Sequence, residues 1–108
     1  VDIFAMWCSP CRYQIEELTD LVSTYGSGDL AVVSVDVDES EQAADIREFR
    51  AEYGATWKFS SYSASFSSEF PATAIPTLYL IDREGNIVNT HQGAKSASEL
   101  SAEISPLM

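Results

Sequence analysis

Apolar residues follow two different spacings along the chain, and these spacings predict alternating strands and helices. Short apolar runs, which are typical of buried strands, occupy residues 1–6, 30–35 and 78–81. A further short strand is expected over residues 56–59, and residues 87–92 follow a glycine-containing turn and are expected to pair back with residues 78–81. Apolar residues recur every three or four positions, as on one face of a helix, in residues 10–25, 43–53 and 100–107. The first two long strands flank a helix, so we expect them to be parallel with a right-handed crossover, whereas the last two form a hairpin. This order predicts an α/β fold with a mixed central sheet and helices on both faces.

Sequence signals for helix ends and loops refine this prediction. Serine or aspartate followed three residues later by glutamate is typical of a capping box, and such pairs occur at Asp38 with Glu41 and at Ser96 with Glu99. We therefore expect each pair to begin a helix. Residues 60–68 are rich in serine and predict a surface loop that ends in one short helical turn.

Length and composition limit the classes of protein to which the chain can belong. Its 108 residues predict a single domain over residues 1–108, and the apolar fraction of 45% suits one hydrophobic core. No apolar run approaches the ~20 residues needed to span a bilayer. The chain opens directly in a strand, so we expect an upstream N-terminal segment with room for a signal or an anchor.

The charge balance is strongly acidic, with 17 Asp and Glu residues against 6 Lys and Arg residues and a net charge of −11. A field of this sign repels nucleic acid and anionic membrane surfaces, so neither is an expected partner. Four of the carboxylates, at Asp36, Asp38, Glu39 and Glu41, do not have the spacing of a calcium loop. They predict a solvated helix start instead.

The only two cysteines, Cys8 and Cys11, lie where the first strand ends and the helix of residues 10–25 begins. A helix N-terminus offers unpaired N–H groups and the positive end of the helix dipole, and both favour a thiolate over a thiol. A cysteine placed there has a lowered pKa and is a better nucleophile at neutral pH. The spacing also lets the second sulfur reach the first and close a small disulfide ring. The pair therefore predicts a reversible dithiol switch.

Three other interpretations of the cysteine pair stay open beside the redox interpretation, which we favour. A zinc site needs two further ligands, but the chain has no other cysteine and a single histidine, His91, which we expect on the surface. No metal site is therefore expected. A purely structural disulfide across so short a loop would constrain the unfolded chain little. Two reduced thiols in the core are the third interpretation, because free cysteine is often buried.

Four features of the chain together resemble the thioredoxin fold. Residues 7–11, Trp-Cys-Ser-Pro-Cys, resemble the W-C-x-P-C motif of that family. Asp2 falls where thioredoxins carry a buried carboxylate, residues 75–77 match the family's I-P-T loop, and Gly93 follows the last strand as the family's glycine does. The resemblance covers essentially all 108 residues and implies a three-layer α/β/α sandwich with a central mixed sheet.

Further stretches of the chain are similar to the TlpA/ResA-like branch of the thioredoxin superfamily. These stretches are Arg12, residues 36–40, the added segment 41–59 and residues 80–88. Members of this branch are mostly extracytoplasmic thiol–disulfide reductases, and they are often tethered to a membrane. The resemblance therefore implies an extracytoplasmic or membrane-tethered location, with a cytoplasmic location as the alternative.

The resemblance, together with the chemistry of the motif, implies roles for three residues at the centre of the site. Cys8, which we expect to be partly exposed, is the nucleophile that attacks a client disulfide. Cys11, one turn further on and more buried, then attacks Cys8 and releases the client. Asp2 is the candidate proton acceptor for Cys11, because a carboxylate in an apolar strand has a raised pKa. The alternative for Asp2 is an exposed residue at a frayed chain end.

Five more residues are expected to shape the site or to contact the client. The resemblance implies a cis peptide bond at Pro76, with a trans proline as the alternative, and leaves the backbone of Ile75 open to pair with a client peptide. Trp7 is expected to lie beside the sulfurs and to offer clients a flat apolar surface, unless it only fills the core. Ser9 and Pro10 are expected to tune the redox potential.

We therefore expect a thiol–disulfide oxidoreductase that reduces or exchanges disulfides in protein clients. Its redox group is the Cys8–Cys11 disulfide, and no other cofactor is expected. The expected partners are client proteins with thiols or disulfides and an upstream thiol electron donor, and the expected state is a monomer. The alternatives are a general cytosolic thioredoxin and a non-catalytic binding module of the same fold.

Overall fold

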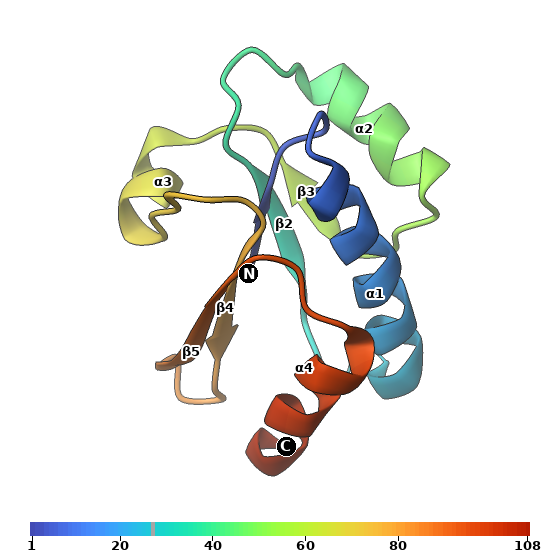
Figure 1. The fold of residues 1–108 in the computed structure, drawn as a ribbon, viewed down its shortest axis with the longest axis vertical. Helices are drawn as coiled ribbons and strands as arrows, with labels where there is room; N and C mark the ends of the chain where they lie inside the picture. The colour runs from blue at the N-terminus through green and yellow to red at the C-terminus, as the bar shows by residue number, and fades with distance from the viewer. Residues whose placement is uncertain (27) are drawn as a thin grey trace.

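A five-stranded mixed sheet forms the centre of the molecule in the computed structural model, which describes residues 1–26 and 28–108 (Figure 1). The strands are β1 (Asp2–Phe4), β2 (Val33–Asp36), β3 (Lys58–Ser60), β4 (Thr77–Ile81) and β5 (Ile87–Gln92). The helices are α1 (Ser9–Tyr25), α2 (Ala43–Glu52), α3 (Ala64–Glu69), α4 (Ala97–Ile104) and the 3₁₀ helix η1 (Ser105–Leu107). The predicted α/β class and mixed sheet are confirmed.

The strand order is β3-β2-β1-β4-β5, which places β1 at the centre of the sheet. β1 pairs in parallel with β2, and β2 pairs in parallel with β3, as expected for strands joined through helices. β4 runs antiparallel to β1 and to β5, so the last two strands form the predicted hairpin. Because β1 is central, all three of its residues are buried, and the segment that follows it leaves the sheet from its middle.

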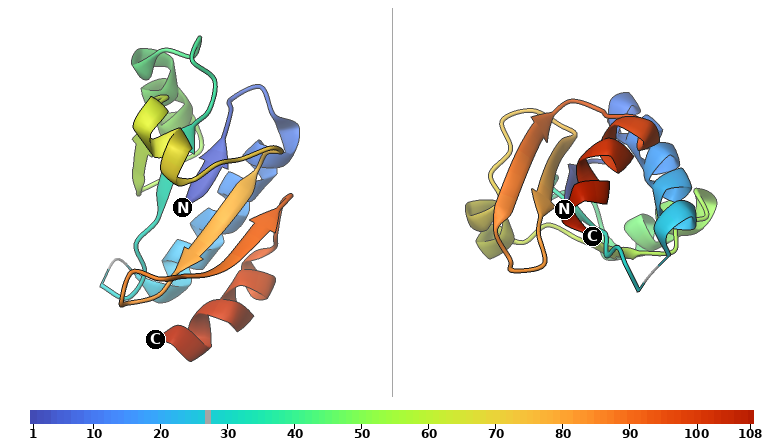
Figure 2. Two further views of the ribbon diagram at one scale, coloured as in Figure 1. Left: turned by 90° about the vertical axis from the view of Figure 1, so that its left-hand side faces the viewer. Right: turned by 90° about the horizontal axis from the view of Figure 1, so that it is seen from below.

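Helices cover both faces of this sheet (Figure 2). Helices α1, α2 and α4 pack on the face to which Phe4 and Leu78 point, and together they form the larger hydrophobic core. The short helix α3 covers part of the other face, where Phe66 packs near Ile3 and Tyr79. The sheet therefore separates two apolar layers, and α1 carries the cysteine motif on the side of the larger one.

Several boundaries differ from the sequence prediction: β2 begins at Val33 instead of residue 30, and β3 covers Lys58–Ser60 instead of residues 56–59. The first strand ends at Phe4 instead of residue 6, because the chain turns after Ala5 and the Cys8 N–H donates to the Ala5 carbonyl at 3.2 Å. The serine-rich segment forms a complete short helix, α3, within the predicted loop. Its first turn is capped by Ser63, whose Oγ accepts the Phe66 N–H at 3.3 Å.

The capping box predicted at Asp38 and Glu41 is wrong. Helix α2 begins after Gln42, and within residues 28–108 no side chain caps it. The Glu41 carboxylate accepts the backbone N–H of Met6 instead, and Asp38 accepts the indole N–H of Trp7. Contacts with the segment that precedes the cysteines thus replace the local cap.

The second predicted capping box is confirmed at the start of α4. The Oγ of Ser96 accepts the Glu99 N–H at 3.2 Å, and the Glu99 carboxylate accepts the Ser96 N–H at 3.2 Å.

In the described residues, none of the helices is both long and apolar enough to cross a membrane.

Replacing Ser96 with alanine is expected to lower the free energy of unfolding by about 1 kcal/mol, because the Glu99 N–H at the start of α4 loses its side-chain acceptor. Chemical denaturation followed by circular dichroism measures this difference. Ser96→Asp keeps a side-chain acceptor and serves as the matched control, with a stability within ~0.5 kcal/mol of the parent. Equal stabilities for the alanine variant and the parent would contradict the role of this cap.

Candidate active site

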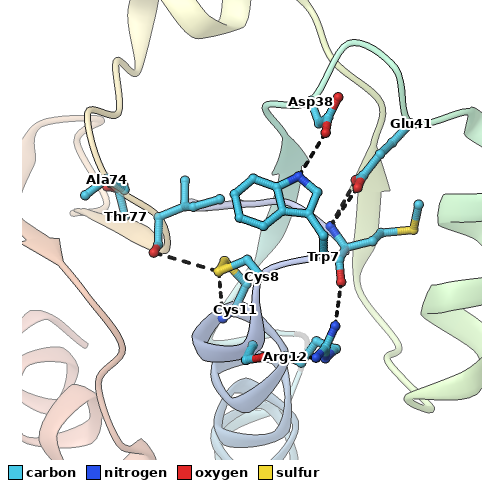
Figure 3. Close-up of a disulfide and its surroundings, with 11 residues drawn as sticks. Trp7, Cys8, Cys11, Arg12, Asp38, Glu41, Ala74 and Thr77 are labelled. Carbon is cyan, nitrogen blue, oxygen red and sulfur yellow. Dashed lines mark hydrogen bonds between the residues drawn. A yellow bond between two sulfur atoms is a disulfide. The ribbon is translucent and has the colours of Figure 1, made fainter.

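The two cysteines lie at the N-terminus of α1 and form a disulfide (Figure 3). Cys8 is the N-cap residue of this helix, and its Sγ accepts the backbone N–H of Cys11 at 3.2 Å. The sulfur of Cys8 therefore lies at the positive end of a 17-residue helix dipole and receives one of its unpaired N–H groups. This environment stabilises a negatively charged sulfur when the disulfide opens.

Both cysteines are more enclosed than the sequence suggests. Cys8 is 4% exposed, so the expectation that it is partly exposed is wrong for the disulfide form, and Cys11 is completely buried. Cys8 is covered in part by the segment before β4, where the carbonyl oxygen of Ile75 lies 3.8 Å from its Sγ. The Ile75–Pro76 peptide bond is cis, and Pro76 is buried. Cys8 is nevertheless the more exposed of the two residues.

Trp7 projects into solvent directly beside the disulfide, with 64% of its surface exposed. Its indole N–H donates to a carboxylate oxygen of Asp38 at 2.9 Å, as Figure 3 shows. The interpretation of Trp7 as a core residue is therefore wrong. The hydrogen bond fixes one edge of the ring and leaves an apolar face open next to Cys8.

Ser9 and Pro10, the residues between the cysteines, are exposed in the first turn of α1. Proline is favoured at this place because the first N–H groups of a helix have no partner inside the helix. The guanidinium of Arg12 donates to Ser9 Oγ and to the Met6 carbonyl, each at 3.0 Å. Arg12 therefore connects the first turn of α1 to the segment that precedes the motif.

Asp2 is buried in β1, with 1% of its surface exposed, so the interpretation as an exposed residue at a frayed end is wrong. One of its oxygens accepts the Ser34 hydroxyl at 2.7 Å, and the other has no hydrogen-bond partner among the described residues. Burial raises the pKa of Asp2 from 3.8 to about 6, although the hydrogen bond from Ser34 opposes this shift. Asp2 can therefore take up or release a proton near neutral pH.

Sequence reasoning missed Gln14, which is completely buried in α1. Its side-chain amide donates to the Lys95 carbonyl at 2.9 Å and accepts the Lys95 N–H at 2.7 Å. These two bonds join the cysteine helix to the loop between β5 and α4. Its position in the sequence could have indicated its burial, because Gln14 lies three residues after Cys11 on the apolar face of the helix.

Sequence reasoning also missed the buried carboxyl group of Asp36, which was interpreted as part of a solvated helix start. Asp36 lies at the end of β2 without exposed surface, and one of its oxygens accepts the Asp38 N–H at 2.8 Å. Its pKa is raised well above the ordinary range, first by burial and then by contact with the Glu41 carboxyl group. The burial of Asp36 could have been inferred from its position, because it directly follows the other buried residues of its strand.

His91 is partly buried on β5, so its expected place on the surface is only partly correct. Its Nε2 lies 2.8 Å from an oxygen of Glu103. Across residues 1–26 and 28–108, no group of three or more His, Cys, Asp and Glu side chains is arranged to hold a metal ion.

Comparisons with known proteins agree with this architecture. Thioredoxin-like protein YneN of Bacillus subtilis is 26% identical over 96% of this chain and 61% of its own length. Thiol-disulfide oxidoreductase ResA of Oceanobacillus iheyensis is 27% identical over 93% of this chain and 52% of its own length. The chain thus spans less than two thirds of the length of either relative.

Similarity to a solved structure extends the agreement to the fold. The crystal structure of a thiol:disulfide interchange protein of the thioredoxin family from Chlorobium tepidum superposes with a TM-score of 0.88, at 23% identity. The match covers 98% of this chain and 76% of that one, which confirms the predicted thioredoxin fold. The sequence model of the Redoxin family matches residues 1–104. The chain therefore belongs to the Redoxin family, and its predicted resemblance to ResA-like proteins is confirmed.

Proposed function

We propose that this chain is a thiol–disulfide oxidoreductase that reduces or exchanges disulfides in protein clients. The observation that carries the proposal is the position of Cys8, whose sulfur is the N-cap of α1 and accepts the Cys11 N–H. This arrangement favours a thiolate on the residue that is nearer to solvent. It also keeps the second sulfur within bonding distance of the first, as the disulfide demonstrates. The names of the relatives support the same activity.

The reduction of a client proceeds in two exchanges. The Cys8 thiolate attacks one sulfur of the client disulfide, forms a mixed disulfide and expels the other client sulfur as a thiolate. Cys11 then loses its proton to Asp2, attacks Cys8 and expels the remaining client sulfur. The protein ends with the Cys8–Cys11 disulfide, and two electrons have passed to the client, which takes up protons from solvent. An upstream thiol donor reverses the oxidation, and no other cofactor takes part.

Residues around the sulfurs receive the client in this proposal. The exposed face of Trp7 offers an apolar surface beside the disulfide, which suits a protein segment better than a small ion. The backbone of Ile75, next to Pro76, lies against Cys8 and can pair with an extended client segment. Ser9 and Pro10 lie between the sulfurs and tune the redox potential.

We also propose that the protein acts as a monomer outside the cytoplasm or tethered to a membrane, as its resemblance to the TlpA/ResA-like branch implies. Alkylation of Cys8 in whole cells that produce the full-length protein tests the location. A membrane-impermeant reagent that labels Cys8 only after cell lysis would favour the cytoplasmic alternative.

Direct exchange with a protein disulfide tests the proposed activity. The fully reduced protein is mixed with insulin in the absence of other thiols. The free thiols of both proteins are then alkylated, and mass spectrometry measures how many remain. We expect one Cys8–Cys11 disulfide to form for each insulin disulfide reduced, because each exchange transfers two electrons. Insulin that stays oxidised while Cys8 and Cys11 stay reduced would instead support the non-catalytic binding module.

A further inference from the structure

The turn between β1 and α1 decides where the sulfur of Cys8 lies. Only three residues, Ala5, Met6 and Trp7, separate the end of β1 from Cys8. The turn is closed by the hydrogen bond from the Cys8 N–H to the Ala5 carbonyl at 3.2 Å. A change in the peptide conformation at Met6 therefore moves Cys8 relative to the helix N-terminus and to Ile75.

Two charged side chains hold the Met6 backbone from opposite sides. The Glu41 carboxylate accepts the Met6 N–H at 2.9 and 3.2 Å through its two oxygens. The Arg12 guanidinium donates to the Met6 carbonyl at 3.0 Å. Glu41 and Arg12 come from different elements, the β2–α2 connection and α1, and Figure 3 shows both beside the motif. Hydrogen bonds to ionised groups are about twice as strong as neutral ones.

A buried carboxyl group lies behind Glu41. Asp36 has no exposed surface, and one of its oxygens has no donor among the described residues. Its side chain contacts that of Glu41, and two ionised carboxylates in contact would repel each other. Burial and the neighbouring Glu41 carboxyl group raise the pKa of Asp36 to about 8, so Asp36 keeps its proton near neutral pH and this repulsion is avoided.

We propose that Glu41 and Arg12 are positioning residues for disulfide exchange, because they fix the Met6 peptide and thereby the place of Cys8 at the start of α1. Asp36 supports this arrangement because a protonated Asp36 does not repel the neighbouring Glu41 carboxylate. None of the three contacts the client disulfide. The inference rests on the proposed function and adds to it the groups that preorganise the nucleophile.

Variants of Glu41 distinguish the effect of its hydrogen bond to the Met6 N–H from the effect of its negative charge. In Glu41→Ala the Met6 N–H loses its acceptor, and we expect the rate constant for attack by Cys8 to fall about ten-fold. In Glu41→Gln the amide oxygen accepts the same N–H and the amide N–H₂ donates to Asp36, so the rate returns to within about two-fold of the parent. Arg12→Ala removes the bond on the other side and should lower the rate similarly. Glu39→Ala is the matched control, because Glu39 is exposed on the same loop and makes no hydrogen bond in the described part of the chain.

The measurement is the second-order rate constant of the reduced protein with 5,5′-dithiobis(2-nitrobenzoate), with folding checked by circular dichroism. A folded Glu41→Ala variant that reacts like the parent overturns the inference, as does a Glu41→Gln variant that stays as slow as the alanine variant. If Glu41→Ala does not fold, Arg12→Ala and Glu41→Gln decide in the same way. A parent protein that does not react with this reagent or with insulin refutes the proposed function, and the inference falls with it. A reactive parent with unaffected variants refutes the inference alone.

Discussion

Replacing Cys8 with serine is expected to abolish disulfide exchange, with a loss of at least about 10³-fold in the rate of insulin reduction. The sulfur of Cys8 is the one that accepts the Cys11 N–H at the helix N-terminus, so it is the one stabilised as a thiolate. A serine hydroxyl stays protonated at neutral pH and cannot form a mixed disulfide. Cys11 is completely buried and cannot take over the attack.

Replacing Cys11 with serine is the matched variant, and its expected result is different in kind. Cys8 still attacks the client, but no second sulfur can release it, so a covalent adduct accumulates at one client chain per protein. Mass spectrometry under non-reducing conditions measures the adduct, and added dithiothreitol removes it. An adduct in the Cys8→Ser variant and none in Cys11→Ser would reverse the two assignments.

The parts of the site that follow one another in sequence could be predicted. The motif of residues 7–11 lies between an apolar run and an amphipathic helix, and both patterns are local, so the position of the cysteines at a strand–helix junction followed from them. The hairpin of β4 and β5 and the cap at Ser96 followed from short-range signals in the same way. Strand ends were less accurate, because the turn after Ala5 shortens β1 and no local signal marked it.

The contacts between distant segments could not be predicted. Asp38 and Glu41 have the spacing of a capping box, yet their carboxylates bind Trp7 and Met6, more than 30 residues earlier in the chain. A local pattern states what a side chain can bind within one turn, but not which competing donor the fold brings closer. The burial of Asp36 was missed for a related reason, because an acidic residue after a strand is usually solvated.

Replacing Asp2 with asparagine is expected to stabilise the oxidised protein increasingly as pH rises. The pKa of Asp2 is raised from 3.8 to about 6 in the folded protein, so the folded state binds its proton more tightly than the unfolded state does. Stability from this group is fully present below about pH 4, declines as pH rises and is lost above about pH 6. The shift corresponds to about 3 kcal/mol between these limits, and an asparagine side chain at this position would not titrate. The asparagine oxygen can still accept the Ser34 hydroxyl.

Urea denaturation of the two oxidised proteins at pH 4, 6 and 8 measures this difference. Asp36 also titrates with a raised pKa, so the parent and the variant share that contribution, and the difference between them isolates Asp2. A constant difference across the three pH values would show that folding does not shift the pKa of Asp2, and it would contradict the prediction.

The same substitution is expected to slow the release of the client about ten-fold at pH 7, because in the proposed exchange Asp2 accepts the proton of Cys11. The decay of the mixed disulfide with insulin, followed by mass spectrometry, measures this step separately from the attack by Cys8. The difference between the two release rates should shrink as pH rises, because hydroxide in solution then takes the Cys11 proton without Asp2. A variant that gains stability but releases the client at the parental rate at pH 7 would show that Asp2 is only a buried carboxylate. Higher stability together with slower release would mean that the protein keeps a destabilising charge in its core because catalysis requires it.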